Sequence, residues 1–242
     1  MAWVDRLSGA IRMDPWSAHG IPSLMDAGLV PVKRLSLAKA RLQDHFSRAD
    51  CTRIARALFE DVMELCAAAG FISWWIVSDD AKVIEAASAR GLNVVADRGA
   101  GLNSALVDAI DAVSRAGARS VTIVPSDIPL AARSDLIDLL DTGATSDLVV
   151  VPSRSDGGTN ALYMSPPGLI EPQFGPGSLA AHIADAENRK LRCSVLPLER
   201  VELDIDTIED VQTFLHRASE EVALGGRTAV LLRDLVDASD FG

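Results

Sequence analysis

The chain has 242 residues, of which 48% are hydrophobic, 24% are charged and only 5% are aromatic. Such a chain can bury a sizeable aliphatic core, and its composition excludes a disordered, collagen-like or disulfide-rich protein. The formal net charge is −11, from 23 basic and 34 acidic residues, which argues against binding to nucleic acid or to an anionic membrane. No stretch approaches the roughly 18 apolar residues of a membrane-spanning helix. The three cysteines are far apart in the sequence, which predicts reduced thiols and a cytoplasmic protein.

The first part of the chain alternates strand-like and helix-like segments at short intervals. We expect strands at 28–32, 73–77, 93–96, 120–125 and 148–151, and helices at 47–69, 81–89, 102–116 and 134–140. Such alternation predicts βαβ units, and therefore an α/β fold with a mainly parallel sheet and helices on both faces. The wholly apolar run at 148–151 is expected to lie near the centre of that sheet.

The pattern becomes less regular after residue 160. A strand at 161–164 is expected to run in the opposite direction, followed by a helix at 178–187, a strand at 193–196 and a helix at 207–219. The amphipathic run at 229–236 predicts either a last helix or the contact of a homodimer. We expect residues 25–242 to form a single domain behind a disordered N-terminal arm at 1–24.

Four cations follow the first predicted strand within nine residues of one another, namely Lys33, Arg34, Lys39 and Arg41. In parallel α/β sheets, ligands bind beyond the carboxyl ends of the strands. Cations placed there could neutralise a triphosphate and hold its oxygens. The alternative is a solvated basic turn, although the overall acidity of the chain makes such a cluster less ordinary.

Three aspartates follow strand-like runs and are candidate ligands for Mg²⁺, namely Asp127, Asp204 and Asp206. Mg²⁺ is commonly held by one or two carboxylates together with substrate phosphates. Asp204 and Asp206 would point the same way in an extended chain, where they repel each other unless a metal lies between them. Helix capping is the alternative, by Asp127 in one case and by Asp206 or Thr207 in the other.

Further candidates lie in glycine-containing turns and at strand ends. The turn at 156–160 could bring backbone N–H groups and Thr159 to an anion, or it could be an ordinary hairpin. Ser178 follows Gly175-Pro176-Gly177 and could either cap a helix or line an anion site at its N-terminus. His182, one turn further on, faces the same side, although a lone histidine is more often structural. Asp79 and Asn103 are candidates near a nucleotide, and a cap would equally explain Asn103.

Taken together, these motifs resemble one family over about residues 28–217. They are Val30-Pro31-Val32-Lys33, Ala38-Lys39-Ala40-Arg41-Leu42, Pro125-Ser126-Asp127-Ile128-Pro129, Gly158-Thr159-Asn160-Ala161-Leu162, Phe174-Gly175-Pro176-Gly177-Ser178 with His182, and Asp204-Ile205-Asp206-Thr207. The family is that of the guanylyltransferases of deazaflavin coenzyme F-420 biosynthesis. The resemblance implies a nucleotide-diphospho-sugar transferase-like, Rossmann-like fold.

The resemblance also implies an activity, the transfer of GMP from GTP to the phosphate of a small phosphorylated carboxylic acid with release of pyrophosphate. Matched residue by residue, it assigns Mg²⁺ to Asp127, Asp204 and Asp206, and it counts these aspartates and Lys39 as catalytic groups. It assigns the acceptor to a set comprising Thr159, Asn160, Gly175, Ser178 and His182. It assigns the nucleotide to a set comprising Lys33, Lys39, Arg41, Asp79 and Asn103.

The sequence leaves the acceptor open among phosphoenolpyruvate, 2-phospho-L-lactate and 3-phospho-D-glycerate. Leu179 stands where the family often has an aromatic residue, and Ala40 stands where it often has a hydroxyl residue. Two other functions stay open: a nucleotidyltransferase of the same fold that uses CTP or a sugar phosphate, and a non-catalytic nucleotide-binding subunit.

Overall fold

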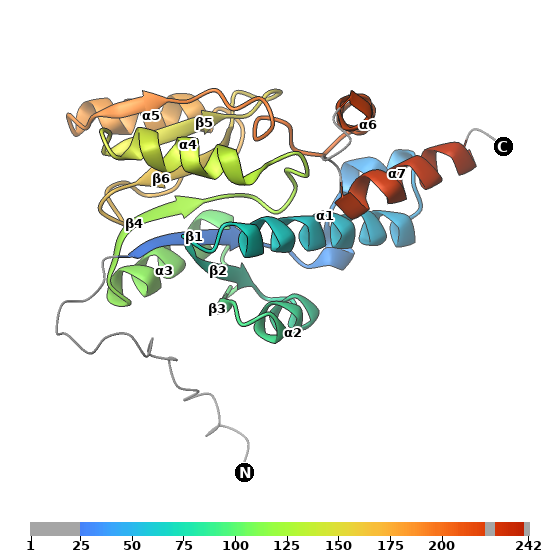
Figure 1. The fold of residues 1–242 in the computed structure, drawn as a ribbon, viewed down its shortest axis with the longest axis horizontal. Coiled ribbons are helices and arrows are strands. Elements are labelled where there is room, and N and C mark those ends of the chain that lie inside the picture. The colour runs from blue at the N-terminus through green and yellow to red at the C-terminus, as the bar shows by residue number, and fades with distance from the viewer. Residues whose placement is uncertain (1–24, 221–225, 240–242) are drawn as a thin grey trace, which may run out of the picture.

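The computed structural model describes residues 25–220 and 226–239. Within them, seven strands form one sheet in the order β3-β2-β1-β4-β6-β5-β7 (Figure 1). The strands are β1 (Met25–Pro31), β2 (Ser73–Ser78), β3 (Asn93–Ala96), β4 (Ala118–Ile123), β5 (Leu148–Pro152), β6 (Thr159–Met164) and β7 (Cys193–Val195). The helices are α1 (Arg48–Ala68), α2 (Ala81–Ala89), α3 (Leu102–Arg115), α4 (Arg133–Gly143), α5 (Ser178–Asn188), α6 (Ile208–Glu220) and α7 (Gly226–Ser239).

The sheet is parallel except at β6, which pairs antiparallel with both β4 and β5. The predicted α/β fold, the mainly parallel sheet and the reversed strand after residue 160 are therefore confirmed. One position in the sheet is wrong: β5 is fully covered but lies second from the edge, with β7 beyond it. Burial on both faces, rather than a central place, explains its apolar run.

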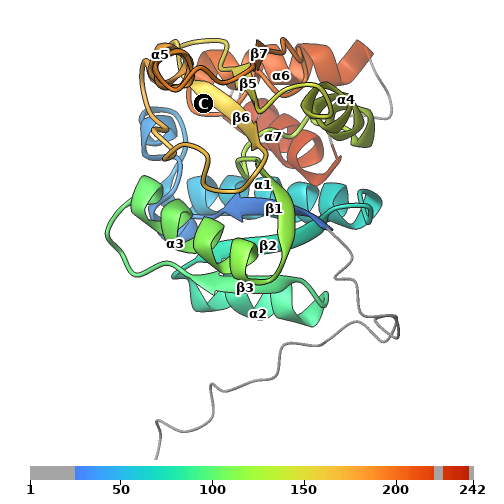
Figure 2. The ribbon, with the colours of Figure 1, turned by 90° about the vertical axis from the view of Figure 1, so that its left-hand side faces the viewer.

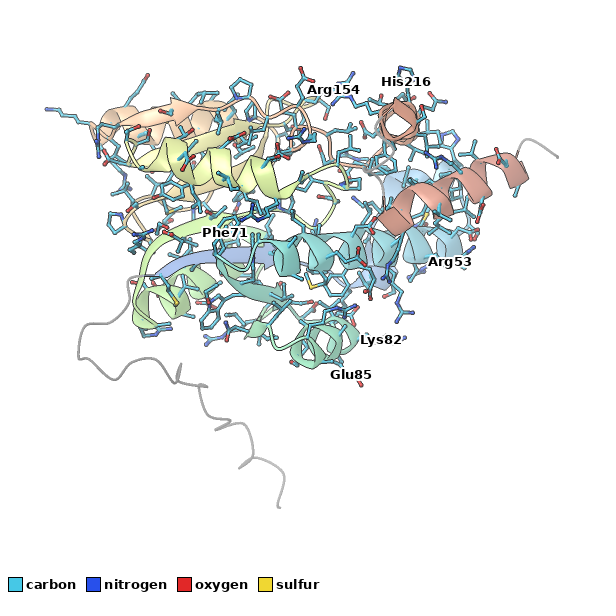
Figure 3. The ribbon with its side chains drawn as sticks, viewed as in Figure 1. Arg53, Phe71, Lys82, Glu85, Arg154 and His216 are labelled. Atoms are coloured by element: carbon cyan, nitrogen blue, oxygen red, sulfur yellow. The ribbon has the colours of Figure 1, made fainter. Side chains whose placement is uncertain are left out.

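Helices cover both faces of the sheet, as predicted. Side chains of α1, α2 and α4 share one core layer, and side chains of α3 and α5 share the layer on the opposite face. Figure 2 shows α3 in front of β1 and β2, and α5 and α4 on opposite sides of β5 and β6. The face that carries α1 also receives Phe71, which follows that helix and lies beside α4 (Figure 3), where the guanidinium of Arg133 stacks 5.0 Å above its ring.

A third apolar cluster lies beyond the sheet and joins α6 and α7 to the first half of α1. It is built on Leu42, Ile54, Ile205, Phe214 and Leu232, each almost fully buried. The last predicted helix is thus confirmed, and it packs within the chain against α1. Because Leu42 and Ile205 belong to this cluster, it fixes two of the segments that carry candidate site residues.

Two further predictions concern the N-terminal arm and membrane-spanning helices. The predicted N-terminal arm at 1–24 lies outside the described residues. None of the described helices is both long enough and apolar enough to cross a membrane.

We expect Gly28→Ala to destabilise the protein by about 2 kcal/mol, because overpacking a filled core forces neighbours to shift. A Cβ at Gly28 would overlap the ring of Trp74 and lie 2.8 Å from Ile72. Urea unfolding would measure the change. The matched control is Gly70→Ala, whose added carbon meets nothing nearer than a backbone oxygen at 4.0 Å. Equal stability of the two variants would contradict this packing.

Candidate active site

The candidate site lies at the carboxyl edge of the sheet, where β1 and β4 are neighbours. The chain leaves β1 towards β2 on one side, whereas β4 starts the half of the sheet on the other side. Such a reversal of strand order leaves a crevice for ligands in parallel α/β sheets. Lys39 follows β1 and Asp127 follows β4, so both residues lie at this point. The segment at 204–206 joins them, because the N–H of Ile205 donates to the carbonyl of Asp127 (3.1 Å).

The ammonium of Lys39 binds two of the three predicted metal ligands. Its Nζ donates to Oδ2 of Asp127 at 2.7 Å and to Oδ1 of Asp206 at 3.0 Å, while the Lys39 side chain is only 6% exposed. Burial alone would lower the pKa of Lys39, but the two carboxylates outweigh it and raise that pKa. Lys39 is therefore a fixed positive charge at this edge of the sheet.

The backbone of Lys39 is itself unusual. Its φ of 58° lies in the left-handed region, which costs a residue with a Cβ free energy. Two short 3₁₀ helices, at Leu35–Leu37 and Ala40–Asp44, flank it and turn the side chain inwards. The N–H of Leu35 donates to Asp80 at the end of β2 (3.1 Å), which fixes the start of this turn.

The pKa values of the two acids of the 204–206 segment shift in opposite directions. Burial tends to raise the pKa of Asp206, but Lys39 and then Arg41 and Lys33 outweigh it, so the pKa of Asp206 is lowered. Burial, followed by repulsion from Asp127, raises the pKa of Asp204 to about 6. Asn160 donates from Nδ2 to Asp204 (3.1 Å) and to the carbonyls of Val201 and Glu202. Among the described residues, Asp204 is the one acid of these three without an ion pair to a cation.

Helix capping, the alternative explanation of these acids, does not account for them. At the start of α4, the N–H of Ala132 donates to Asp135 (2.8 Å), and Asp127 takes no part. At the start of α6, the N–H of Thr207 donates to the carboxylate of Asp210, and the N–H of Asp210 donates to the hydroxyl of Thr207. Capping by Thr207 was one of the alternatives that the sequence left open. The carboxylate of Asp206 is left for Lys39.

The predicted trio does not form a ready-made metal cage. Among residues 25–220 and 226–239, no three carboxylate, imidazole or thiol side chains are placed to share one ion. The donor chemistry nevertheless fits Mg²⁺, because the ammonium of Lys39 is shared by the carboxylates of Asp127 and Asp206, and burial together with repulsion from Asp127 raises the pKa of the third acid, Asp204. The residues fit an ion that takes most of its ligands from phosphates and water.

The predicted acceptor residues gather where β6 begins, at the same edge of the sheet because β6 runs in reverse. Oγ1 of Thr159 lies 3.0 Å from Nδ1 of His182, and the N–H of Gln173 donates to Nε2 of His182 (2.9 Å). The side chain of Ser178 is buried and its Oγ has no hydrogen-bond partner among the described residues. The capping role expected for Ser178 is wrong, because Gly177 is the N-cap and Ser178 is the first residue of α5. Gly175 lies two residues ahead of that cap, with a φ of 136°.

The remaining candidates are the residues that the sequence assigned to the nucleotide. Both polar atoms of the Asn103 amide are already used, one donating to the carbonyl and one accepting from the N–H of Phe174. Asp79 accepts from Arg34 at 2.8 Å. Arg41 is 72% exposed and 3.7 Å from Asp206, and Lys33 is exposed. The contacts with Phe174 and Arg34 explain Asn103 and Asp79 structurally, whereas Lys33 and Arg41 remain accessible cations.

Two contacts were not foreseen from the sequence. The position of Lys39 between Asp127 and Asp206 joins residues 88 and 167 positions apart, so no local pattern could show it. Gln173 acts through its backbone N–H, which any residue other than proline would supply, and its side-chain type therefore carries no signal.

The fold defines the class of the protein. A crystal structure of a protein proposed to be a nucleotide-diphospho-sugar transferase, from Desulfovibrio desulfuricans G20, superposes with a TM-score of 0.77 at 18% identity, over 89% of this chain and 97% of that one. The 4-diphosphocytidyl-2C-methyl-D-erythritol synthase of Anaerococcus prevotii superposes with a TM-score of 0.55 at 12% identity, over 78% and 96%. The chain has the nucleotide-diphospho-sugar transferase fold.

Sequence comparison defines the family. The family model described as "Guanylyl transferase CofC like" matches residues 27–224. The phosphoenolpyruvate guanylyltransferase of Sphaerobacter thermophilus is 35% identical over 76% of this chain and 89% of its own. The 2-phospho-L-lactate guanylyltransferase of Methanothermobacter thermautotrophicus is 34% identical over 78% and 83%. The chain belongs to the CofC-like guanylyltransferase family and is a nucleotidyltransferase, so the predicted family is confirmed.

We expect His182 to make the protein less stable as the pH falls from about 6.5 to about 4. Burial lowers the pKa of His182 from 6.5 to about 4, so the unfolded chain takes up a proton in that interval and the folded protein does not. The free energy of unfolding therefore falls by up to about 3 kcal/mol through this group. The difference in the free energy of unfolding between the wild type and His182→Asn should shrink by that amount on acidification, as measured by urea unfolding.

The matched control is His45→Asn, because His45 is exposed. Its stability relative to the wild type should not vary with pH in this range. A constant difference between the wild type and His182→Asn would contradict the buried, neutral state of His182.

Proposed function

We propose that the protein transfers GMP from GTP to the phosphate of a small phosphorylated carboxylic acid and releases pyrophosphate. Membership of the family and the names of the relatives support this reaction. The observation that carries it is the group of Lys39, Asp127 and Asp206 at the reversal of strand order. We further propose that the reaction belongs to coenzyme F-420 biosynthesis.

The reaction needs little covalent help from the protein. A phosphate monoester has a second pKa near 6 and is already a nucleophile at neutral pH, so we assign no general base. The barrier lies in bringing an anionic acceptor in line with a triphosphate. Lys39, with Lys33 and Arg41 exposed beside it, would screen that repulsion and stabilise charge on the departing pyrophosphate.

We propose that Mg²⁺ arrives with the nucleotide and is held by Asp127, Asp204 and Asp206. The raised pKa of Asp204, caused by burial and then by repulsion from Asp127, supports this placement, and Lys39 explains why the protein alone would bind the ion weakly. When bound, the ion would neutralise phosphate charge.

The acceptor is proposed to bind at the start of β6 and of α5. Thr159 and Ser178 offer hydroxyls there, and the dipole of α5 favours an anion at the N-terminus of that helix. The relatives are named for two different acceptors at similar identity. Phosphoenolpyruvate and 2-phospho-L-lactate are therefore both proposed as candidates, with 3-phospho-D-glycerate as a third.

The test of the function is product analysis by mass spectrometry. The purified protein is incubated with Mg²⁺, each of GTP, CTP and ATP, and each of the three phospho-acids. We expect a guanylylated phospho-acid and one equivalent of pyrophosphate with GTP only. Transfer from CTP, or to a sugar phosphate added to the panel, would replace the proposal with a different activity of the same fold. No transfer in any mixture would contradict an enzymatic role in this reaction.

Aspartate variants link that activity to the site. We expect Asp127→Asn and Asp206→Asn each to lower GMP transfer at least about a hundredfold, the scale on which charge-stabilising groups act. Circular dichroism should show an intact fold. The matched control is Asp138→Asn, an exposed position on α4, which should transfer GMP at the wild-type rate. Near-normal transfer by either site variant would refute the assignment.

We expect Lys39→Met to bind a divalent cation without nucleotide at least about tenfold more tightly than the wild type. Removing the ammonium leaves the carboxylates of Asp127 and Asp206 without the cation that they share, which strengthens their attraction for a divalent ion. Mn²⁺ binding followed by electron paramagnetic resonance would measure the affinity. The control is Lys82→Met, which lies on the outer surface of α2 (Figure 3). If Lys39→Met binds Mn²⁺ no better than the wild type, Lys39 does not compete with the ion.

A further inference from the structure

His182 is a fully buried histidine on α5 with both ring nitrogens engaged. The imidazole ring packs edge-to-face against the ring of Phe174, with the ring centroids 5.6 Å apart and an angle of 72° between the ring planes. Nε2 accepts a hydrogen bond from the N–H of Gln173 at 2.9 Å. Nδ1 lies 3.0 Å from Oγ1 of Thr159. The residue itself is 0% exposed, so it cannot touch a ligand in the crevice directly.

These contacts fix the tautomer of His182. A backbone N–H can only donate, so Nε2 must present a lone pair to Gln173. A neutral imidazole with a lone pair on Nε2 carries its proton on Nδ1. Nδ1 is therefore the donor in the contact with Thr159, and Oγ1 of Thr159 is the acceptor.

The fixed tautomer in turn constrains the hydroxyl of Thr159. Because one lone pair of Oγ1 receives the N–H of His182, the O–H of Thr159 must point elsewhere. Within the described part of the chain it has no acceptor. The backbone turn before Thr159 is bonded to the start of α5, through Gly177 N–H to Asp156 O (3.2 Å) and Leu179 N–H to Gly157 O (3.1 Å). That turn therefore places Thr159 beside the start of α5, which carries the unpartnered hydroxyl of Ser178.

We propose that His182 is a positioning residue for the acceptor, holding the hydroxyl of Thr159 so that its O–H donates to an anionic oxygen of that substrate. The identity of the acceptor rests on the proposed function. The direction of the hydrogen bonds follows from the contacts of His182 and does not depend on that function. The ligand chemistry required is a phosphate or carboxylate oxygen, an acceptor without a proton of its own. A neutral imidazole does this without placing a second charge in the core.

The first test reads the tautomer directly in the wild-type protein. A long-range ¹H–¹⁵N spectrum of the histidine rings is recorded at pH 7, and the signals of His182 are assigned by their loss in His182→Asn. We expect a protonated Nδ1 and an unprotonated Nε2. A proton on Nε2, or on both nitrogens, would overturn the inference whatever the enzyme does.

The second test asks whether His182 acts through Thr159. The variant His182→Phe keeps an aromatic ring at this position but loses the N–H donor. We expect the KM for the phospho-acid to rise about tenfold, which corresponds to the loss of one hydrogen bond to an anion. The KM for GTP should be unchanged. His182→Asn can place its amide nitrogen near the position of Nδ1 and should recover most of that loss. Thr159→Val should raise the acceptor KM at least as much as His182→Phe does.

The double variant decides between positioning and mere support of the fold. With Thr159 already replaced by Val, adding His182→Phe should raise the acceptor KM no further, because the two residues act as one unit. An equal rise in both backgrounds would show that His182 acts on the fold alone and would overturn the proposal.

The two proposals can fail separately. If the wild type transfers GMP to none of the phospho-acids, the proposed function falls. The tautomer of His182 and a phosphoenolpyruvate titration of the same five proteins then decide the inference. In that titration, the dissociation constant takes the place of KM.

Discussion

A buried ammonium between two carboxylates is the interaction on which the rest of this site depends. Lys39, Asp127 and Asp206 come from three segments that are far apart in the sequence and meet where the strand order reverses. Taking these charges out of water is costly, and leaving one unpaired costs more. Apolar packing holds two of the three segments in place, because Leu42 and Ile205 enter the cluster formed with α1, α6 and α7. That packing lets Lys39 keep a left-handed backbone and point inwards.

The same edge of the sheet presents two kinds of chemistry side by side. On one side, the charged group around Lys39 suits a nucleoside triphosphate and its cation. On the other, the reversed direction of β6 brings Thr159 to the edge at which the parallel strands end, and α5 places Ser178 and His182 beside it. The side chains of Thr159 and Ser178 contribute hydroxyl groups to this side. Such a division fits a reaction in which one polyanion must be screened and a second, smaller anion must be aimed at it.

Much of the fold could be predicted from local pattern. Apolar periodicity and glycine or serine boundaries located the helices closely; α1, for example, is capped by Ser47 as its start pattern implied. The place of β5 could not be predicted, because a strand covered on both faces reads the same at the centre of a sheet and one strand from its edge.

The candidate site was predictable as a set of residues but not as a set of partners. The order of the motifs assigned Asp127, Asp204 and Asp206 to one site, whereas only the three-dimensional arrangement shows that Lys39 lies between two of them. Ser178 was expected to cap α5, yet its hydroxyl has no partner among the described residues. The reason is physical: a side-chain type limits which bonds are possible, and tertiary packing decides which of them form.

The central claim is that the group of Lys39, Asp127 and Asp206 is the place where the triphosphate and its metal ion bind. A crystal structure of the protein with Mg²⁺ and a GTP analogue that cannot be cleaved between the α- and β-phosphates tests it most directly. The account predicts phosphate oxygens and the ion over the neighbouring ends of β1 and β4, in contact with Lys39 and at least one of the aspartates. A nucleotide bound elsewhere, with the ion pairs of Lys39 unchanged, would contradict it.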